Sequence, residues 1–337
     1  MADDGANLWP SFAALSLPSG LDETSFNTVR VGANESHHLG KDISGAPVLL
    51  IATQPDSPNA RMTAGIRLNH LSVDHGQTCS VEASDTTAFQ QSFTVIRCRP
   101  NDAALYRPFL MILGPLVTTL GAKPTQRETN VVISALIKLF RSLAAPPTKS
   151  IQGLWAELFI IERATDPLKM LSAWHSDPFE KFDFADGAQR LEVKSSALSS
   201  RSHHFALDQL ITSTKREILI ASMFVQRSTG GMSLAALVES IRARVSLDMM
   251  LVGRLNEVVF TSLGISYDAA LTDSFDYQLA IETLRFFHAG DVPCVSKPTP
   301  PNVTNVHFVS DLSAVAPLTD TAISALGNLF SSCLPSR

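Results

Sequence analysis

The sequence predicts an α/β (α+β) protein with a β-rich N-terminal domain and a core in which a central mixed sheet is flanked by helices. Residues 27–100 contain short apolar runs separated by turn residues, a pattern typical of strands. Residues 151–164 and 233–245 carry apolar side chains at helical spacing. The apolar run over residues 216–225 lies between these two helices and predicts a central strand of the core.

The best linker in the chain is the stretch over residues 144–150, which contains two adjacent prolines. We therefore place a domain boundary there. Further helices are expected over residues 101–120, 124–143, 247–264 and 319–329, and further strands over 203–207, 275–287 and 306–309. The expected organisation is a β-rich domain ending in a helix (1–122), a helix with the Pro-rich linker (123–150), the core (151–250) and a C-terminal extension packed on the core (251–337).

The composition limits the classes of protein that the chain can belong to. Hydrophobic residues make up 45% and charged residues 18% of the sequence, enough for a substantial core. The formal net charge of −5 argues against a protein that coats DNA by electrostatics alone. No apolar run is long enough to span a membrane, and the acidic N-terminus has no signal-peptide pattern. The four cysteines are scattered, so we expect neither disulfides nor a zinc site, and a cytoplasmic location.

Residues 182–196 are the stretch with the most unusual charge pattern. Asp186 and Gly187 form a turn dipeptide between two segments that alternate apolar and charged side chains, which predicts a β-hairpin. Successive side chains of a strand point to opposite faces, so Glu192 and Lys194 share one face. Asp183 lies on the neighbouring strand, where it would meet them.

Glu157 is a single carboxylate within the apolar helix predicted over residues 151–164. If its side chain lies on the buried face, it needs an ion-pair partner or a metal, because an isolated buried charge is costly. If it lies at the edge of the apolar stripe, it is simply in contact with water. The helix alone leaves these two interpretations equal.

The acidic residues and the lysine would suit hydrolysis assisted by a divalent cation. Mg²⁺ or Mn²⁺ prefers carboxylate oxygens, which Asp183 and Glu192 would supply, with Glu157 as a further ligand. Lys194 would orient the attacking water or stabilise the charge that develops on the phosphorane. Gln209, at the start of the next predicted helix, would position substrate or water. The alternative is an exposed strand face with ordinary ion pairs.

Four blocks in this order resemble the PD-(D/E)xK nuclease superfamily: residues 153–158 (GLWAEL), 182–184 (FDF), 191–195 (LEVKS) and 207–210 (LDQL). More closely, they resemble an uncharacterised bacterial family assigned to that superfamily, whose genes lie near restriction-modification and phage-defence genes. The resemblance implies a restriction-endonuclease-like core with Asp183 as the first acid and Glu192 and Lys194 as the (D/E)xK pair. Phe182 stands where the superfamily pattern has proline, and Asp186 is a competing first acid.

A group of cations follows the acidic residues and would contact DNA phosphates if it lines the substrate groove. The second interpretation, an ordinary solvated loop, is equally consistent with the sequence. The members of this group are Arg201, His203, His204, Lys215 and Arg216.

The first hypothesis is a Mg²⁺- or Mn²⁺-dependent DNA endonuclease, the nuclease subunit of a bacterial restriction or phage-defence system. Its expected partners are DNA and a helicase-like ATPase or methyltransferase subunit, and a homodimer is compatible with the sequence. The alternative is a catalytically inactive nuclease-fold subunit that binds DNA or such a partner. A third option is a metal-dependent hydrolase of another substrate. Carboxylates of Asp183 and Glu192 that lie too far apart to share one ion, or an unrelated ion pair that locks Lys194, would favour the inactive subunit.

Overall fold

The structure is a computed structural model, and it describes residues 8–32, 36–54, 64–68, 70–83, 86–98, 103–175, 180–210, 216–295 and 302–335. The chain forms two compact units, Met1–Ala144 and Ala145–Arg337. Each unit contains helices and sheets, so the chain is a mixed α+β protein. Among the described helices, none combines the length and the apolar character needed to cross a membrane.

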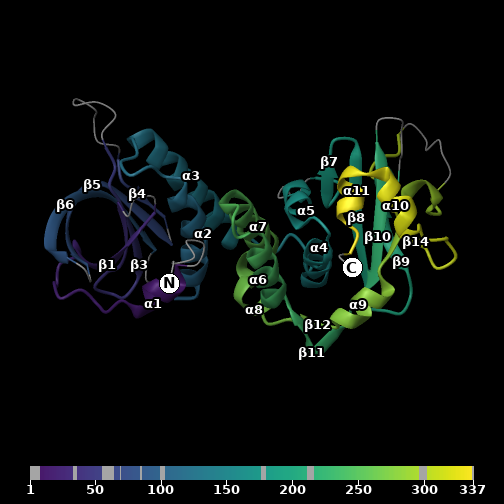
Figure 1. Cartoon of the computed structure of the whole chain (residues 1–337), viewed down its shortest axis with the longest axis horizontal. Helices are drawn as coiled ribbons and strands as arrows, with labels where there is room; N and C mark the ends of the chain where they lie inside the picture. The colour runs from purple at the N-terminus through teal and green to yellow at the C-terminus, as the bar shows by residue number, and fades with distance from the viewer. Residues whose placement is uncertain are drawn as a thin grey trace. The chain divides into compact units, whose positions relative to one another are not determined.

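The N-terminal unit contains a six-stranded sheet that closes on itself. Its strands follow the order β1-β2-β3-β6-β5-β4, and β1 also pairs with β5 in parallel, which completes the ring visible in Figure 1. Phe26, Leu50 and Phe93 are among the apolar side chains packed in one buried cluster of this sheet. The strands are β1 (Ser25–Val31), β2 (His37–Lys41), β3 (Pro47–Ile51), β4 (Ile66–Arg67), β5 (Leu71–Ala83) and β6 (Thr86–Cys98).

The helices of the N-terminal unit mostly follow its strands in the chain. The longest, α3, begins where Thr125 and Glu128 form a capping box, in which each side chain accepts a hydrogen bond from the backbone N–H of the other residue. The structure confirms the helix predicted over residues 124–143. The helices are α1 (Trp9–Ala14), η2 (Ala103–Leu105), α2 (Tyr106–Thr118) and α3 (Gln126–Leu143).

The C-terminal unit contains a four-stranded mixed sheet with the order β13-β10-β8-β7. The central strands β8 (Gln189–Ser196) and β10 (Glu217–Phe224) are parallel, whereas β7 (Phe184–Asp186) and β13 (Arg285–His288) are antiparallel to their neighbours. In Figure 1, α4 and α5 lie on one side of β8 and β10, and β9 and β14 lie on the other. Both faces of the sheet are therefore covered, which explains the uninterrupted apolar sequence of β10.

The remaining elements of this unit surround the sheet. Helix α4 packs against β8 and against α6, and β9 pairs with β14 over a cluster that includes Phe205 and Ile220. The helices are α4 (Ile151–Arg163), α5 (Pro167–Ala173), η3 (Leu207–Gln209), α6 (Leu234–Val245), α7 (Met249–Leu263), η4 (Gly264–Ser266), α8 (Tyr267–Ala270), α9 (Tyr277–Thr283), η5 (Ala289–Asp291), α10 (Asp320–Leu326) and α11 (Asn328–Ser332). The additional strands are β9 (Ser202–Ala206), β11 (Arg227–Ser233), β12 (Ser274–Phe275) and β14 (His307–Asp311).

Two local predictions need correction. The alternating residues after Phe275 form helix α9 and not a strand, because the Asp276 side chain accepts a hydrogen bond from Leu279 N and caps a helical turn. The last predicted helix is broken into α10 and α11 at Gly327, whose φ of +66° lies in the left-handed region. The alternation of apolar residues in a short segment did not distinguish a strand from a helix at Phe275.

Helix α11 holds the start of β8 from the C-terminal end of the chain. The buried Gln189 donates a hydrogen bond to Leu326 O and accepts one from Phe330 N. Leu329 and Phe330 are themselves fully buried. The strand that carries Glu192 and Lys194 is thus fixed at its first residue by the last helices of the chain.

The linker that leads into α4 is held by the end of α7. Thr148 N donates to Ser262 O at 3.0 Å, and Ile265 N donates to Ala145 O at 3.0 Å. Gly264 has a φ of +49°, and a Cβ atom added there would lie 2.0 Å from Ala145 O. Only glycine fits this position, because a side chain would be strained and would push the linker away.

We expect Gly264→Ala to lower the free energy of unfolding of the C-terminal unit by about 2 kcal/mol or more, from backbone strain and the clash with Ala145 O. Gly230→Ala is the matched control, because a Cβ atom there would meet nothing within 4 Å. Urea unfolding followed by circular dichroism measures both. Equal stability of the two variants would contradict the close approach at Gly264.

Candidate active site

Glu192 and Lys194 are alternate residues of the central strand β8, and their side chains meet on one face of the sheet. Lys194 Nζ lies 2.7 Å from Glu192 Oε1. Glu192 is 5% exposed, because β8 lies between β7 and β10 and is covered on both faces. Glu192 is therefore a buried carboxylate paired with a half-buried lysine, which differs from the alternative of an exposed strand face with ordinary ion pairs.

Gln209 completes this pair from the short turn η3. Its Nε2 donates to Glu192 Oε1 at 2.8 Å, and its Oε1 accepts from Ala206 N at 3.1 Å and from Lys194 Nζ at 3.4 Å. The sequence predicted that Gln209 would begin a helix. It lies instead in a 3-10 turn, which aims the amide at both members of the ion pair.

Asp183 reaches the same region from the residue just before β7. Strand β7 begins at Phe184, which pairs with Leu191 of β8. No residue of β7 therefore lies opposite Val193 to accept a hydrogen bond from its backbone N–H. Asp183 Oδ2 takes that place and accepts from Val193 N at 2.9 Å. Asp183 therefore sits beside Glu192 and Lys194, although it lies outside the strand in which it was expected.

Asp186, the competing first acid, points elsewhere. Its carboxylate forms an ion pair with Lys169 at 2.7 Å, and Gly187 beside it makes the hairpin turn with a φ of +52°. The structure thus brings Asp183, and not Asp186, to the Glu192–Lys194 pair.

Glu157 projects from the buried side of α4 and is 4% exposed. Its Oε2 accepts a hydrogen bond from the indole nitrogen of Trp174 at 2.7 Å. Of the two interpretations left open by the sequence, contact with water at the edge of the helix is therefore wrong. The buried carboxylate requires the partner that the other interpretation demanded.

That partner is Lys149, which sequence reasoning missed. Lys149 Nζ lies 2.6 Å from each carboxylate oxygen of Glu157 and 3.2 Å from Asp183 Oδ1. Lys149 belongs to the linker before α4, and no periodic pattern relates it to Glu157 or Asp183. The only local signal is that it precedes Ser150, whose side chain caps α4. We refer to Lys149, Glu157, Asp183, Glu192 and Lys194 as the carboxylate cluster.

Burial and mutual repulsion perturb the acids of the cluster. Burial, followed by the nearby Asp183 carboxylate, raises the pKa of Glu157 to about 8 and that of Glu192 to about 7. Burial opposes the charged form of Lys149, but Glu157 and Asp183 outweigh it and raise the pKa of the ammonium. With all groups charged, three carboxylates face two ammonium groups, so the cluster carries one net negative charge and favours cations.

The donor atoms of the cluster match the chemistry of a hard divalent cation, which prefers several carboxylate oxygens in a partly dry site. The spacing of these donor atoms does not match a metal site. Within the described ranges, no group of three or more His, Cys, Asp or Glu side chains is arranged to hold a metal ion. The ammonium groups of Lys149 and Lys194 lie among the oxygens instead. The donor set fits a metal once these oxygens are drawn together.

The predicted DNA-binding residues divide into two groups. Arg201 donates to Ser222 O and Oγ at 2.8 Å each and also to Thr283 O, so its guanidinium is used inside the unit. His203 is buried against Ser222 Oγ at 2.8 Å. Both side chains are therefore engaged within the unit, and their contact with DNA stays a prediction.

The other members of that group remain open to solvent or lie outside the described residues. His204 and Arg216 are exposed, and the Arg216 guanidinium lies 6.0 Å from the Phe182 ring centroid. Lys215 lies outside the described residues. Among the residues that the structure describes, His204 and Arg216 are therefore the members of this group that remain exposed.

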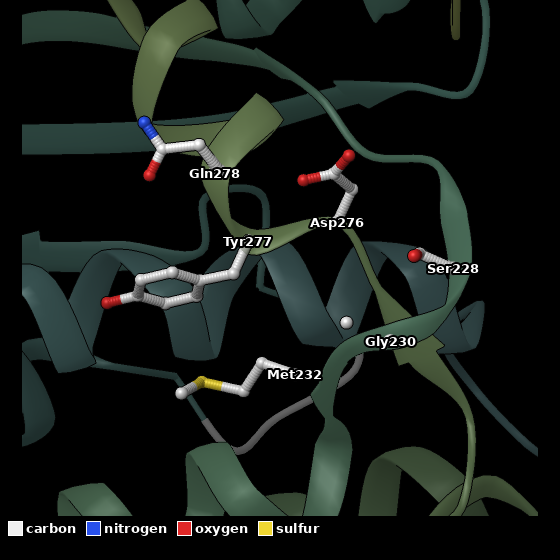
Figure 2. A pocket seen from close by; sticks show the side chains of 7 residues that line it. Ser228, Gly230, Met232, Asp276, Tyr277 and Gln278 are labelled. Carbon is white, nitrogen blue, oxygen red and sulfur yellow. The ribbon is translucent and has the colours of Figure 1, made fainter.

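A separate hollow of about 480 Å³ lies between β11 and the start of α9, as Figure 2 shows. It is lined by Ser228, Gly230, Gly231, Met232, Asp276, Tyr277 and Gln278, and it contains no member of the carboxylate cluster. The polar side chains are already used, because Asp276 caps α9 and Gln278 bonds Glu282. The candidate active site is therefore the carboxylate cluster, where charged side chains converge, and not this hollow.

A helix glutamate, an aspartate ahead of a short strand and a Glu-x-Lys in the next strand make up the class of site found in PD-(D/E)XK proteins. The chain belongs to the family described as "Putative PD-(D/E)XK family member, (DUF4420)", whose model matches residues 8–313. This finding confirms the family predicted from the four sequence blocks. Neither a curated protein nor a solved structure matched the chain.

We expect Trp174→Phe to cost about 2 kcal/mol of stability, because it removes a hydrogen bond to a buried charged group. Trp155→Phe is the matched control: Trp155 Nε1 donates to the neutral Met232 O at 2.9 Å, so its loss should cost about half as much. Chemical unfolding of both variants at pH 9, where the Glu157 carboxylate is charged because the pH lies above its raised pKa of about 8, makes the comparison. A smaller loss for Trp174→Phe than for Trp155→Phe would contradict a charged Glu157.

His203 should make the C-terminal unit less stable in mild acid. Burial, with repulsion from Lys194 and Arg201, lowers the pKa of His203 from 6.5 to about 4. Between these two values the unfolded chain binds a proton that the folded chain does not, so stability is lost as the pH falls through this window. The contribution of His203 to this loss between pH 7 and pH 5 is about 2 kcal/mol. The raised pKa values of Glu157 and Glu192 act in the opposite direction, so the effect of His203 is read as the difference between the wild type and a His203 variant.

His203→Gln should remove this loss, because a glutamine amide keeps a hydrogen-bonding group without binding a proton. Urea unfolding at pH 7 and pH 5 measures it, with His204→Gln at the exposed neighbouring position as the control. The same pH dependence in His203→Gln and in the wild type would show that another group controls stability in acid.

Proposed function

We propose that this protein is a Mg²⁺- or Mn²⁺-dependent DNA endonuclease. The observation that supports the proposal most strongly is that Glu157, Asp183, Glu192 and Lys194 converge from α4, the start of β7 and β8. Membership of a PD-(D/E)XK family supports a nuclease-like fold and DNA as the substrate.

In this proposal Glu157, Asp183 and Glu192 are the metal ligands. When bound, the divalent cation would polarise the scissile phosphate and lower the pKa of a water molecule. Lys194 orients that water and stabilises negative charge on the phosphate through its ammonium. Gln209 keeps Lys194 and Glu192 in position, because its amide bonds both. Burial of the cluster strengthens each of these electrostatic interactions relative to water.

We propose that the mixed sheet β13-β10-β8-β7 and the helices that cover it on the side of α4 form a restriction-endonuclease-like core. We assign the core to residues 151–250 and the C-terminal extension, which supplies the edge strand β13, to residues 251–337. The N-terminal β-rich domain, residues 1–122, would serve a separate task, joined through the helix and linker of residues 123–150.

We further propose that the protein acts in the cytoplasm as the nuclease subunit of a bacterial restriction or phage-defence system. A helicase-like ATPase or a methyltransferase subunit would deliver it to DNA. The net charge of −5 supports this arrangement, since the chain has little excess positive charge to hold DNA by itself.

One observation favours the second candidate, a catalytically inactive subunit with a nuclease fold. Lys149 and Lys194 pair with all three acids, so the cluster is nearly neutral without any metal ion. Such a cluster would also serve as a buried ion-pair network that joins α4 to the sheet. The two candidates differ in whether the acids bind a metal and whether DNA is cut.

We expect Glu192→Gln and Lys194→Met each to lower Mn²⁺-dependent plasmid cleavage at least about 100-fold, because each removes a group that acts on the reacting phosphate. Glu192→Gln should remain folded, because a neutral amide avoids the cost of burying a charged carboxylate, the same cost that raises the pKa of Glu192. The assay uses the full chain, with and without the products of neighbouring genes.

Asp186→Asn is the matched control, because Asp186 is a nearby acid that pairs with Lys169 outside the cluster. It should cut DNA like the wild type. Cleavage that persists in Glu192→Gln and Lys194→Met would mean that the activity has another origin. A wild type that binds DNA and never cuts it would favour the inactive subunit.

A further inference from the structure

Lys149 occupies the position in the cluster where positive charge is most needed. Its ammonium lies within 3.2 Å of three carboxylate oxygens, from two acids that come from different elements. Glu157 and Asp183, the two acids that share the Lys149 ammonium, are also two of the proposed metal ligands. The ammonium and a divalent cation would therefore compete for the same oxygens.

The charges of the cluster do not accommodate both cations. With all groups charged, three carboxylates together with Lys194 and Lys149 leave one negative charge. If a divalent cation is added and Lys149 leaves, the sum becomes zero, whereas with both present it becomes positive. Excess positive charge in a buried site is costly, so occupancy by Lys149 and occupancy by a metal should exclude each other.

The structure also shows how Lys149 can leave without disturbing the fold. Its backbone is held by α7, because Thr148 N and Lys149 N both donate to Ser262 O. Its side chain is 26% exposed, so the flexible four-carbon stem borders solvent. A rotation of this side chain would move the ammonium into water and leave the linker and α4 in place.

We propose that Lys149 is a built-in counter-cation of the cluster, which holds Glu157 and Asp183 together in the metal-free protein and swings out when a divalent cation binds. The inference rests on the proposed metal site. Lys149 is in this view a positioning residue: it keeps the acids close to one another and also sets a threshold for the metal concentration at which the site fills.

Titration of the full chain with Mn²⁺, followed by calorimetry, tests this proposal. Lys149→Met keeps the length of the side chain and removes the competing charge, so we expect it to bind Mn²⁺ at least about tenfold more tightly than the wild type. In chelator, the same variant should unfold at a lower temperature, because the buried Glu157 and the half-buried Asp183 lose their partner. Lys169→Met, which removes a lysine paired with Asp186, is the control and should bind like the wild type.

A second measurement uses the wild type and does not depend on whether the variant folds. An amine-reactive reagent followed by mass spectrometry reports the exposure of Lys149, which should rise when Mn²⁺ is added, while that of Lys169 stays constant. Equal Mn²⁺ affinity in the wild type and Lys149→Met, or a Lys149 that stays protected with Mn²⁺ bound, would overturn the inference and leave the metal site standing. If neither protein binds Mn²⁺, both the inference and the proposed metal site fall.

Discussion

The backbone N–H of Val193 needs an acceptor at a point where the neighbouring strand has already ended. Val193 is half-buried, and a fully buried N–H without a partner would cost about 1–3 kcal/mol, so an acceptor at this point stabilises the fold. Asp183 supplies this acceptor with Oδ2, which fixes the carboxylate beside β8 and leaves Oδ1 toward Lys149. Burial is the main cause of the raised pKa values of Glu157 and Glu192, and the Asp183 charge that adds to it is held in place by this hydrogen bond to the main chain.

A cluster of like charges survives in the interior because the fold supplies cations and dipoles from several elements. Trp174 and Lys149 satisfy Glu157, while Lys194 and Gln209 satisfy Glu192. Removing one partner of such a network leaves an unpaired buried charge, which is more costly than never having the pair. The polar side chains of Arg201 and His203 are likewise given partners within the unit, because both form hydrogen bonds with Ser222 Oγ.

Sequence reasoning identified the hairpin, the central strand and most helices, because these depend on local periodicity and on turn residues such as Gly187. It also placed Glu192 and Lys194 on one face, since alternation in a strand is a geometric certainty. It could not identify Lys149, whose contacts depend on how a linker is held by α7. It misjudged the segment that forms α9, because one cap residue, Asp276, decides the conformation of seven ambiguous residues.

The way that α11 secures β8 has a consequence for the limits of the family. The family match ends at residue 313, before α10 and α11 begin. Yet α11 packs on β8, β7 and α5, and Gln189 takes both of its hydrogen bonds from this region. A fragment cut at residue 313 would uncover an apolar face next to the strand that bears Glu192. The boundary of sequence similarity is therefore not a boundary of folding, and the smallest autonomous unit of this protein extends past it.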